Sequence, residues 1–194
     1  MLKSELGYAP KKYLIRRIYF MKKRFTTTKM TVLLGLFIAM SVIGAYIKIP
    51  NPITSSIALD SLPAYLCALI LGGVPGAIIG FLGHMISAAT AGFPLTLPIH
   101  LLIGLEMSLI MLIFSYIAKR FNIAVAIVIG FILNGICAPA SLIIVPGFGI
   151  AAFTGSVVPL SIASALNILV SCLIYQAIKN IKIVKEMREV KNEL

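Results

Sequence analysis

The sequence of 194 residues has no tryptophan, three cysteines and six acidic residues. Without tryptophan, any belt of aromatic side chains at a membrane interface must consist of tyrosine and phenylalanine. Cys67, Cys137 and Cys172 all fall within apolar runs, without a CxxC or Cys/His spacing. We therefore interpret them as small core residues and expect neither disulfides nor metal ligation.

Sequence motifs of several enzyme classes are also absent. The sequence has no GxxxxGK[ST], which excludes nucleotide hydrolysis by a P-loop, and no HExxH or GxSxG, which argues against zinc and serine intramembrane hydrolases. It lacks a convincing repeat of two halves, which many secondary carriers have. We expect no catalytic residue, no metal and no cofactor. An enzyme with an unfamiliar set of residues and a carrier that acts alone remain the alternatives.

Apolar residues dominate what is present: 60% of the chain is hydrophobic and the mean hydropathy is +1.05, above that of soluble domains. The basic residues that precede the first long apolar run and follow the last one are Lys3, Lys11, Lys12, Arg16, Arg17, Lys22, Lys23, Arg24 and Lys29, then Lys179, Lys182, Lys185, Arg188 and Lys191. Because basic residues collect on the cytoplasmic side of a bilayer, we predict a polytopic membrane protein with both termini inside. Anionic membrane lipid, not nucleic acid, then explains the net charge of +11.

The charge distribution also indicates the number of spans. We predict six, at about 30–47, 57–71, 74–91, 98–120, 123–144 and 156–178. The second run covers only about 22 Å, less than a hydrocarbon core of about 30 Å. If it and the third run formed one interrupted span, Lys119, Arg120 and the C-terminal basic residues would lie outside, against the positive-inside rule. The predicted outer loops are therefore 48–57, 92–97 and 145–155.

The predicted fold is an all-α integral membrane bundle of six transmembrane helices at 30–178. A basic cytoplasmic N-terminal arm (1–29) precedes it and a basic cytoplasmic tail (179–194) follows it. No A-x-A site follows the first apolar run, so we expect an uncleaved first helix, not a signal peptide. Residues 1–20 either form a basic arm on the membrane surface or precede the true start, because Met21 opens an equally plausible beginning.

Small residues recur at every fourth position through the second and third predicted spans: Ala64, Ala68, Gly72, Gly76 and Gly80. Such a ridge lets two helix backbones approach closely within a membrane. The first span carries a further small pair, Gly35 and Ala39. That pair serves either internal packing or docking of another membrane protein.

Ionisable and amide side chains within the apolar runs are the candidates for function, because charged groups inside a bilayer are costly. They are Asp60, His84, His100 and Glu106, joined by Asn134 and Asn167. In the six-span topology all of them lie between the outer surface and the midplane. We therefore predict an outward-facing polar pocket capped by the three outer loops.

Each of these residues also has a structural interpretation. Asp60 or Ser61 can cap the second helix, and single asparagines often make hydrogen bonds between membrane helices. Glu106 lies in mid-helix among leucine, methionine and isoleucine. It is therefore protonated, paired with a histidine, for which His84 is the candidate, or directed at a ligand.

The chain resembles the substrate-binding S components of energy-coupling-factor (ECF) vitamin importers over about residues 30–178. The segments that carry the resemblance are LGLFIAM at 34–40, IALDSLP at 57–63, LGGVPGAIIG at 71–80, GHMISA at 83–88, GFPL at 92–95 and PIH at 98–100, which leads to Glu106. The stretch 58–63, the Gly-His pair and the Pro-x-His segment are most similar to S components assigned to α-ribazole, a cobalamin precursor. Another vitamin, such as pantothenate, is the alternative substrate.

The resemblance implies six helices, a vitamin site near the outer face and no ATPase activity of the chain itself. It further implies a membrane coupling protein and two ABC-type ATPases as partners, in a bacterial plasma membrane. The coupling protein docks on an Ala-x-x-x-Ala motif of the first helix, whose place is taken here by Gly35 and Ala39.

For an aromatic nucleoside, the resemblance suggests stacking by Phe93 or Phe148. Asp60, His84, Asn134 or Glu106 would make hydrogen bonds to the ring nitrogens or the ribose hydroxyls. His100 and Asn167 complete the expected pocket.

Overall fold

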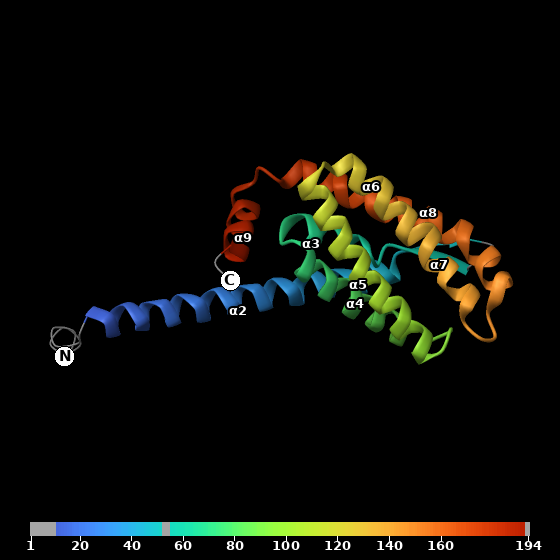
Figure 1. Ribbon diagram of the computed structural model, residues 1–194, viewed down its shortest axis with the longest axis horizontal. Helices are drawn as coiled ribbons and strands as arrows, with labels where there is room; N and C mark the ends of the chain where they lie inside the picture. Colours follow the sequence, from blue (N-terminus) through green and yellow to red (C-terminus); the bar gives the residue numbers. More distant parts are fainter. Residues whose placement is uncertain (1–10, 52–54, 193–194) are drawn as a thin grey trace.

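The structure, a computed structural model, describes residues 11–51 and 55–192 and is mainly helical (Figure 1). Its elements are α2 (Lys11–Tyr46), β1 (Lys48–Asn51), β2 (Ser55–Ala58), α3 (Leu62–Ile70), α4 (Gly73–Thr90), α5 (Leu97–Arg120), α6 (Ile123–Phe131), the π-helix η1 (Ile132–Cys137), α7 (Ala138–Ser141), the 3-10 turn η2 (Leu142–Ile144), α8 (Gly149–Ile178) and α9 (Lys182–Asn192). Helices α3 to α8 pack around a common core, and α2 lies along one side of it.

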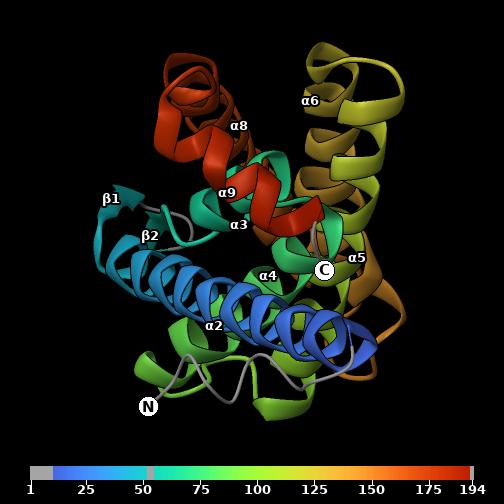
Figure 2. The same ribbon diagram turned by 90° about the vertical axis from the view of Figure 1, so that its left-hand side faces the viewer.

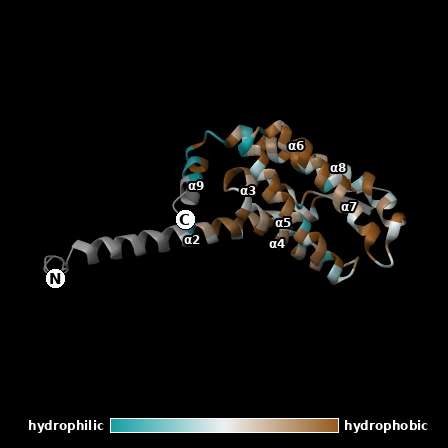
Figure 3. Cartoon of the chain, in the orientation of Figure 1, coloured by the Kyte–Doolittle hydropathy of each residue, from teal (hydrophilic) through white to brown (hydrophobic). Residues whose placement is uncertain are grey.

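Five segments of the described chain are long and apolar enough to cross a membrane: Thr27–Tyr46, Gly73–Thr90, Leu97–Arg120, Ile123–Ile144 and Gly149–Ile178. Their outer faces expose large apolar side chains, such as Leu105 and Leu173, which are 62% and 69% exposed. Figure 3 shows that hydrophobic residues, in brown, predominate along α6 and α8 and alternate with polar ones along α5. An apolar exterior of this extent suits lipid contact, and the chain is a multi-pass membrane protein.

The second predicted span differs from the structure. The helix in this region, α3, has nine residues, all of them buried, and begins only at Leu62. The preceding residues Ser55–Ala58 form an antiparallel pair with Lys48–Asn51, with Lys48 opposite Ala58 and Asn51 opposite Ser55. The prediction of a loop at 48–57 therefore missed two short paired strands. The position of Pro63 within the first turn of α3 is the sequence signal that marks where the helix starts.

The ridge of small residues packs α3 against α4, as its spacing predicted. A Cβ atom added to Gly76 would lie 2.6 Å from the Cβ of Ala68 on α3. Gly80 instead faces α5, where an added Cβ would lie 3.3 Å from the carbonyl oxygen of Met107. The chain reverses between the two helices at Gly72, whose φ of 102° suits glycine. Close approach of backbones here holds α3 inside the bundle.

The two ends of the chain depart from simple flanking arms. Helix α2 continues without a break through the predicted boundary at residues 29 and 30, and its first turns project beyond the bundle (Figure 1). Helix α9 contacts α2 and α3 (Figure 2). Val184 of α9 is 4% exposed, and the Arg188 guanidinium donates a 2.9 Å hydrogen bond to the Tyr175 hydroxyl. The tail therefore folds back on the bundle.

Candidate functional site

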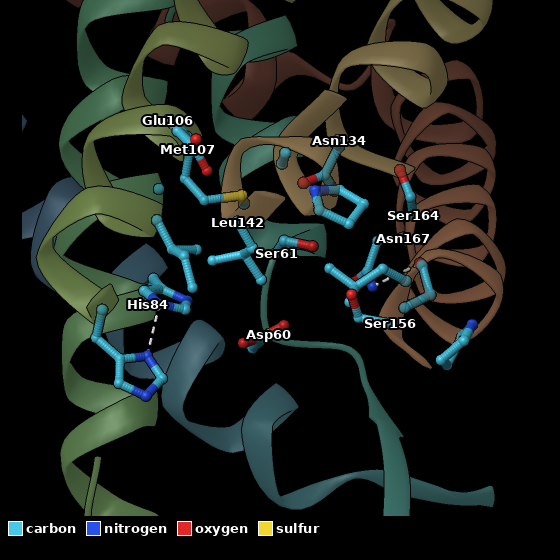
Figure 4. A pocket seen from close by; sticks show the side chains of 18 of the residues that line it. Asp60, Ser61, His84, Glu106, Met107, Asn134, Leu142, Ser156, Ser164 and Asn167 are labelled. Atoms are coloured by element: carbon cyan, nitrogen blue, oxygen red, sulfur yellow. Dashed lines mark hydrogen bonds between the residues drawn. The ribbon is translucent and has the colours of Figure 1, made fainter. Parts of the chain in front are cut away.

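The six polar residues predicted from depth in the membrane line one cavity of about 290 Å³ (Figure 4). They come from distant parts of the chain: Asp60 precedes α3, His84 is on α4, His100 and Glu106 are on α5, Asn134 is in η1 and Asn167 is on α8. The remaining described lining residues are Ser61, Gly80, Leu95, Ile103, Met107, Ala138, Pro139, Leu142, Ser156, Pro159, Leu160, Ala163 and Ser164. The cavity thus has mostly apolar walls with a few polar groups, which is typical of small-molecule sites.

The two histidines bond to each other, so of the three alternatives for Glu106 the pair with His84 is not the one found in the structure. His84 Nε2 lies 3.2 Å from His100 Nδ1. The backbone N–H of Leu95 donates to His100 Nε2 at 3.3 Å, so that nitrogen is the acceptor. His100 therefore carries its proton on Nδ1 and donates to His84, which in turn carries its proton on Nδ1. These tautomers follow from the hydrogen bonds, and they leave His84 with one N–H donor for another partner.

The loop that holds His100 has a strained backbone. Phe93 and Thr96 have φ values of 51° and 74°, which non-glycine residues rarely adopt. The Phe93 ring lies 5.7 Å from the His100 ring, between centroids, and Phe93 is not among the described residues that line the cavity. Of the predicted loop 92–97, Leu95 reaches the cavity. Strain of this kind persists where neighbouring contacts hold it in place.

Asn167 has a structural role that explains its burial. Its Oδ1 accepts a 2.8 Å hydrogen bond from the backbone N–H of Leu62, and its Nδ2 donates to the carbonyl oxygen of Ala163 at 2.8 Å. The N-cap residue Ser61 makes no side-chain cap hydrogen bond, so the first turn of α3 is satisfied by a side chain of α8. Of the two capping candidates, Ser61 therefore does not cap this helix through its side chain, and Asn167 takes that role for the Leu62 N–H. Figure 4 shows the Asp60 carboxyl group facing the cavity.

Asn134 is placed by an irregular helix. The predicted span 123–144 is helical throughout, but Ile132–Cys137 forms a π-helix with Pro139 just after it. A π-helix inserts a residue into the turn and changes the direction of the side chains around it. Asn134 is buried there and lines the cavity.

Glu106 and Ser164 present unused hydrogen-bonding atoms at the cavity. Glu106 Oε2 and Ser164 Oγ are buried, and neither has a hydrogen-bond partner among the described residues. Ser164 is 1% exposed, so its hydroxyl is shielded from bulk water. A buried polar atom without a partner costs about 1–3 kcal/mol, which a bound ligand or water can remove.

Helix α8 supplies residues that the sequence analysis missed. Ser156, Pro159, Leu160, Ala163 and Ser164 share one face of the helix with Asn167. Their i, i+3, i+4 spacing around a buried asparagine is the signal that would have identified them. Because α8 begins at Gly149, much of the predicted loop 145–155 is helical. Phe148, at the start of α8, is not among the described lining residues.

The described residues hold no group of three or more histidine, cysteine, aspartate or glutamate side chains that could bind a metal ion. The cavity can bind a small organic molecule by shape and by hydrogen bonds. Its walls are apolar, and its polar groups are two carboxyl groups, a histidine pair and two amides.

Comparison with known proteins assigns the family. A family model described as "ECF transporter, substrate-specific component" matches residues 29–185. A solved structure described as "Structure and mechanism of the S component of a bacterial ECF transporter" has a similar fold, with a TM-score of 0.60, 15% identity, and coverage of 79% of this chain and 97% of that chain. The sequence matches none of the curated proteins with which it was compared. Members of the matched family bind a small substrate and work with a coupling protein and ATPases. Since the family match spans most of its length, the chain belongs to the substrate-specific components of ECF transporters.

Proposed function

We propose that this chain binds a small vitamin or vitamin precursor, with α-ribazole as the best candidate, and that it serves an ATP-driven importer of a bacterial plasma membrane. The observation that carries the proposal is the convergence of Asp60, His84, Glu106, Asn134 and other polar residues on one cavity with apolar walls. A nucleoside offers ring nitrogens and hydroxyl groups that match such a set. The choice of α-ribazole rests on the resemblance of the 58–63, Gly-His and Pro-x-His segments.

In this proposal the ligand enters from outside. His84 donates its free N–H to an acceptor of the ligand, and Asp60 and Glu106 accept hydrogen bonds from its hydroxyl or N–H groups. His100 and Asn167 hold this arrangement in place, through His84 and through α3. Phe93 and Phe148 stand outside the described lining, so stacking by either of them requires the outer segments to close over the ligand.

The proposed topology has six crossings and both termini in the cytoplasm, with α3 as the short crossing. The N–H of Leu59 donates a 3.1 Å hydrogen bond to the carbonyl oxygen of Gly44, near the outer end of α2. At the other end of α3, a Cβ atom on Gly73 would lie 3.3 Å from the Cα of Leu112, in the half of α5 that ends at Arg120. This course supports α3 as the return toward the cytoplasm. Residues 1–29 and 179–194 are then the basic cytoplasmic segments.

For transport, the chain needs its partners. We assign the docking of the coupling protein to the face of α2 around Gly35 and Ala39, both of which are exposed. ATP hydrolysis by two ABC-type ATPases would then topple the whole S component in the membrane and present the ligand to the inside. If the assignment is correct, Gly35→Trp and Ala39→Trp abolish uptake in cells but leave ligand binding by the purified protein unchanged. Loss of both properties would indicate a folding defect instead.

The experiment that tests the proposed ligand is native mass spectrometry of the full chain purified in mild detergent, followed by calorimetric titration with α-ribazole. A co-purified mass of α-ribazole and saturable binding that Glu106→Leu and His84→Ala weaken are the expected results. If a different vitamin is bound, the proposed transport mechanism stands and that vitamin takes the place of α-ribazole as the ligand. Uptake into proteoliposomes without ATP or partner proteins would favour a carrier that acts alone and would contradict the proposal.

A further inference from the structure

We propose that the cavity selects an uncharged or cationic ligand that carries hydrogen-bond donors and rejects its anionic analogues. This inference rests on the proposed function, because it assigns a charge class to the ligand of the same site. It separates α-ribazole from a 5′-phosphorylated nucleoside and from vitamins that are carboxylic acids.

The first observation is the charge of the lining. Among the described residues that line the cavity, the ionisable groups are Asp60, Glu106, His84 and His100, without lysine or arginine. The basic pair Lys119 and Arg120 lies at the far end of α5, about 20 Å along the helix from Glu106 at 1.5 Å per residue. The carboxyl groups of Asp60 and Glu106 are negative when ionised and neutral when protonated. In neither state does the described lining provide a positive charge that would attract an anionic ligand.

The second observation is the chain of hydrogen bonds that runs from the Leu95 N–H through His100 to His84. The N–H of Leu95 points at His100 Nε2, and the Nδ1 proton of His100 lies between the two rings. A proton added to His100 Nε2 would face the Leu95 N–H, and one added to His84 Nε2 would face the Nδ1 proton of His100. Binding an anion by protonating this pair would therefore break the chain of hydrogen bonds that holds the loop at Leu95.

The third observation concerns the polar atoms that await a partner. Glu106 Oε2 has no hydrogen-bond partner in the described part of the chain, nor has Ser164 Oγ, whose residue is 1% exposed. In the view of Figure 4, Asp60 and Glu106 lie on different sides of the cavity, so a ligand between them meets a carboxyl group at both sides. Ligand O–H or N–H groups can donate to all of these oxygens. An ionised carboxylate of Asp60 or Glu106 repels a phosphate or carboxylate, whereas the Ser164 hydroxyl both accepts and donates and so favours neither kind of ligand.

Two matched ligand pairs test the inference, by calorimetric titration of the full chain in lipid nanodiscs. The first pair is α-ribazole and α-ribazole 5′-phosphate, and the second is panthenol and pantothenate, which differ by a primary alcohol against a carboxylate. In a pair that binds, we expect the uncharged member to bind at least tenfold more tightly. The double variant Asp60→Asn/Glu106→Gln should reduce this ratio of affinities, uncharged over anionic, at least threefold. Ser108→Ala is the control. The Ser108 hydroxyl donates to the carbonyl oxygens of Ala77 and Gly104 and is not among the described lining residues, so this variant should leave the ratio of the two affinities unchanged.

The outcomes separate this inference from the proposed function. An anionic member that binds as tightly as its uncharged partner overturns the inference and leaves a vitamin-binding subunit in place. A cationic or neutral compound other than α-ribazole found in the purified protein supports the inference and replaces the ligand named above. An anionic vitamin found there overturns both the inference and the choice of α-ribazole. No binding across a panel of vitamins of every charge overturns the vitamin-binding function, and the inference with it.

Discussion

At the scale of single residues, the contacts of Asn167 separate structure from binding. Its side chain caps α3 from a different helix, in a buried position. Asn167→Ala should lower the free energy of unfolding by about 1–2 kcal/mol, because the Leu62 N–H is left without a partner. Thermal denaturation in detergent measures the loss, and ligand binding should weaken as well, because Asp60 is positioned by the start of α3.

A matched control for Asn167 exists in the same chain. Asn122 caps α6 with its Oδ1, which accepts a 2.9 Å hydrogen bond from the Val125 N–H at an exposed position. Water replaces that cap when Asn122→Ala removes it, so the loss should be about 0.5–1 kcal/mol and binding should stay unchanged. Equal losses for the two variants would show that the buried contact of Asn167 has no special weight.

The sequence indicated which polar residues line the cavity better than how these residues contact one another. Counting residues from a helix end gives depth in the membrane. Residues placed at similar depth, such as Asp60, Glu106 and Asn134, line one cavity in the structure, and their role in binding stays a prediction. The direction of a side chain around its helix depends on how the helices rotate against one another. For that reason the sequence left three alternatives open for Glu106, one of them a pair with His84, whereas the structure pairs His84 with His100.

At the scale of elements, the contact between α3 and α4 depends on the absence of side chains. Gly76→Ala should destabilise the protein by about 1–3 kcal/mol, because the added Cβ would meet the Ala68 Cβ at 2.6 Å. Gly35→Ala is the control, since a Cβ at Gly35 has no neighbouring atom within 4 Å. Thermal stability of the two variants gives the comparison. If Gly76→Ala is as stable as Gly35→Ala, then α3 and α4 can move apart without loss of stability, which would contradict this prediction.

Long apolar elements were predictable, whereas short or irregular ones were not. The spans at 74–91, 98–120 and 123–144 agree with helical segments to within a residue or so, because each is a continuous apolar run of membrane length. The antiparallel pair of β1 (Lys48–Asn51) and β2 (Ser55–Ala58) is stabilised by backbone hydrogen bonds, which leave little trace in residue type. The π-helix at Ile132–Cys137 is equally hidden, because an α-helix of the same residues is just as apolar.

At the scale of the whole molecule, the proposed six-crossing topology predicts which sites face which side. In a chain without native cysteines, single cysteines at Ala91 and Ile150 should react with a membrane-impermeant maleimide added to intact cells. Cysteines at Phe121 and Ile181 should react only after lysis; all four positions are exposed. An epitope tag at the N-terminus should be protected in the same way as Phe121→Cys. A tag detected outside the cells while Phe121→Cys stays protected would mean that α3 does not cross.

The continuity of α2 has a mechanical consequence. With 36 residues it is a single rod about 54 Å long at 1.5 Å per residue, and it carries the exposed Gly35 and Ala39 on the same body as its projecting first turns. If such a helix tilts by ten degrees about one end, its other end moves by about 9 Å. A small change in the tilt of the bundle therefore produces a large displacement of the first turn of α2, and the position of that turn depends on how the rest of the molecule is oriented.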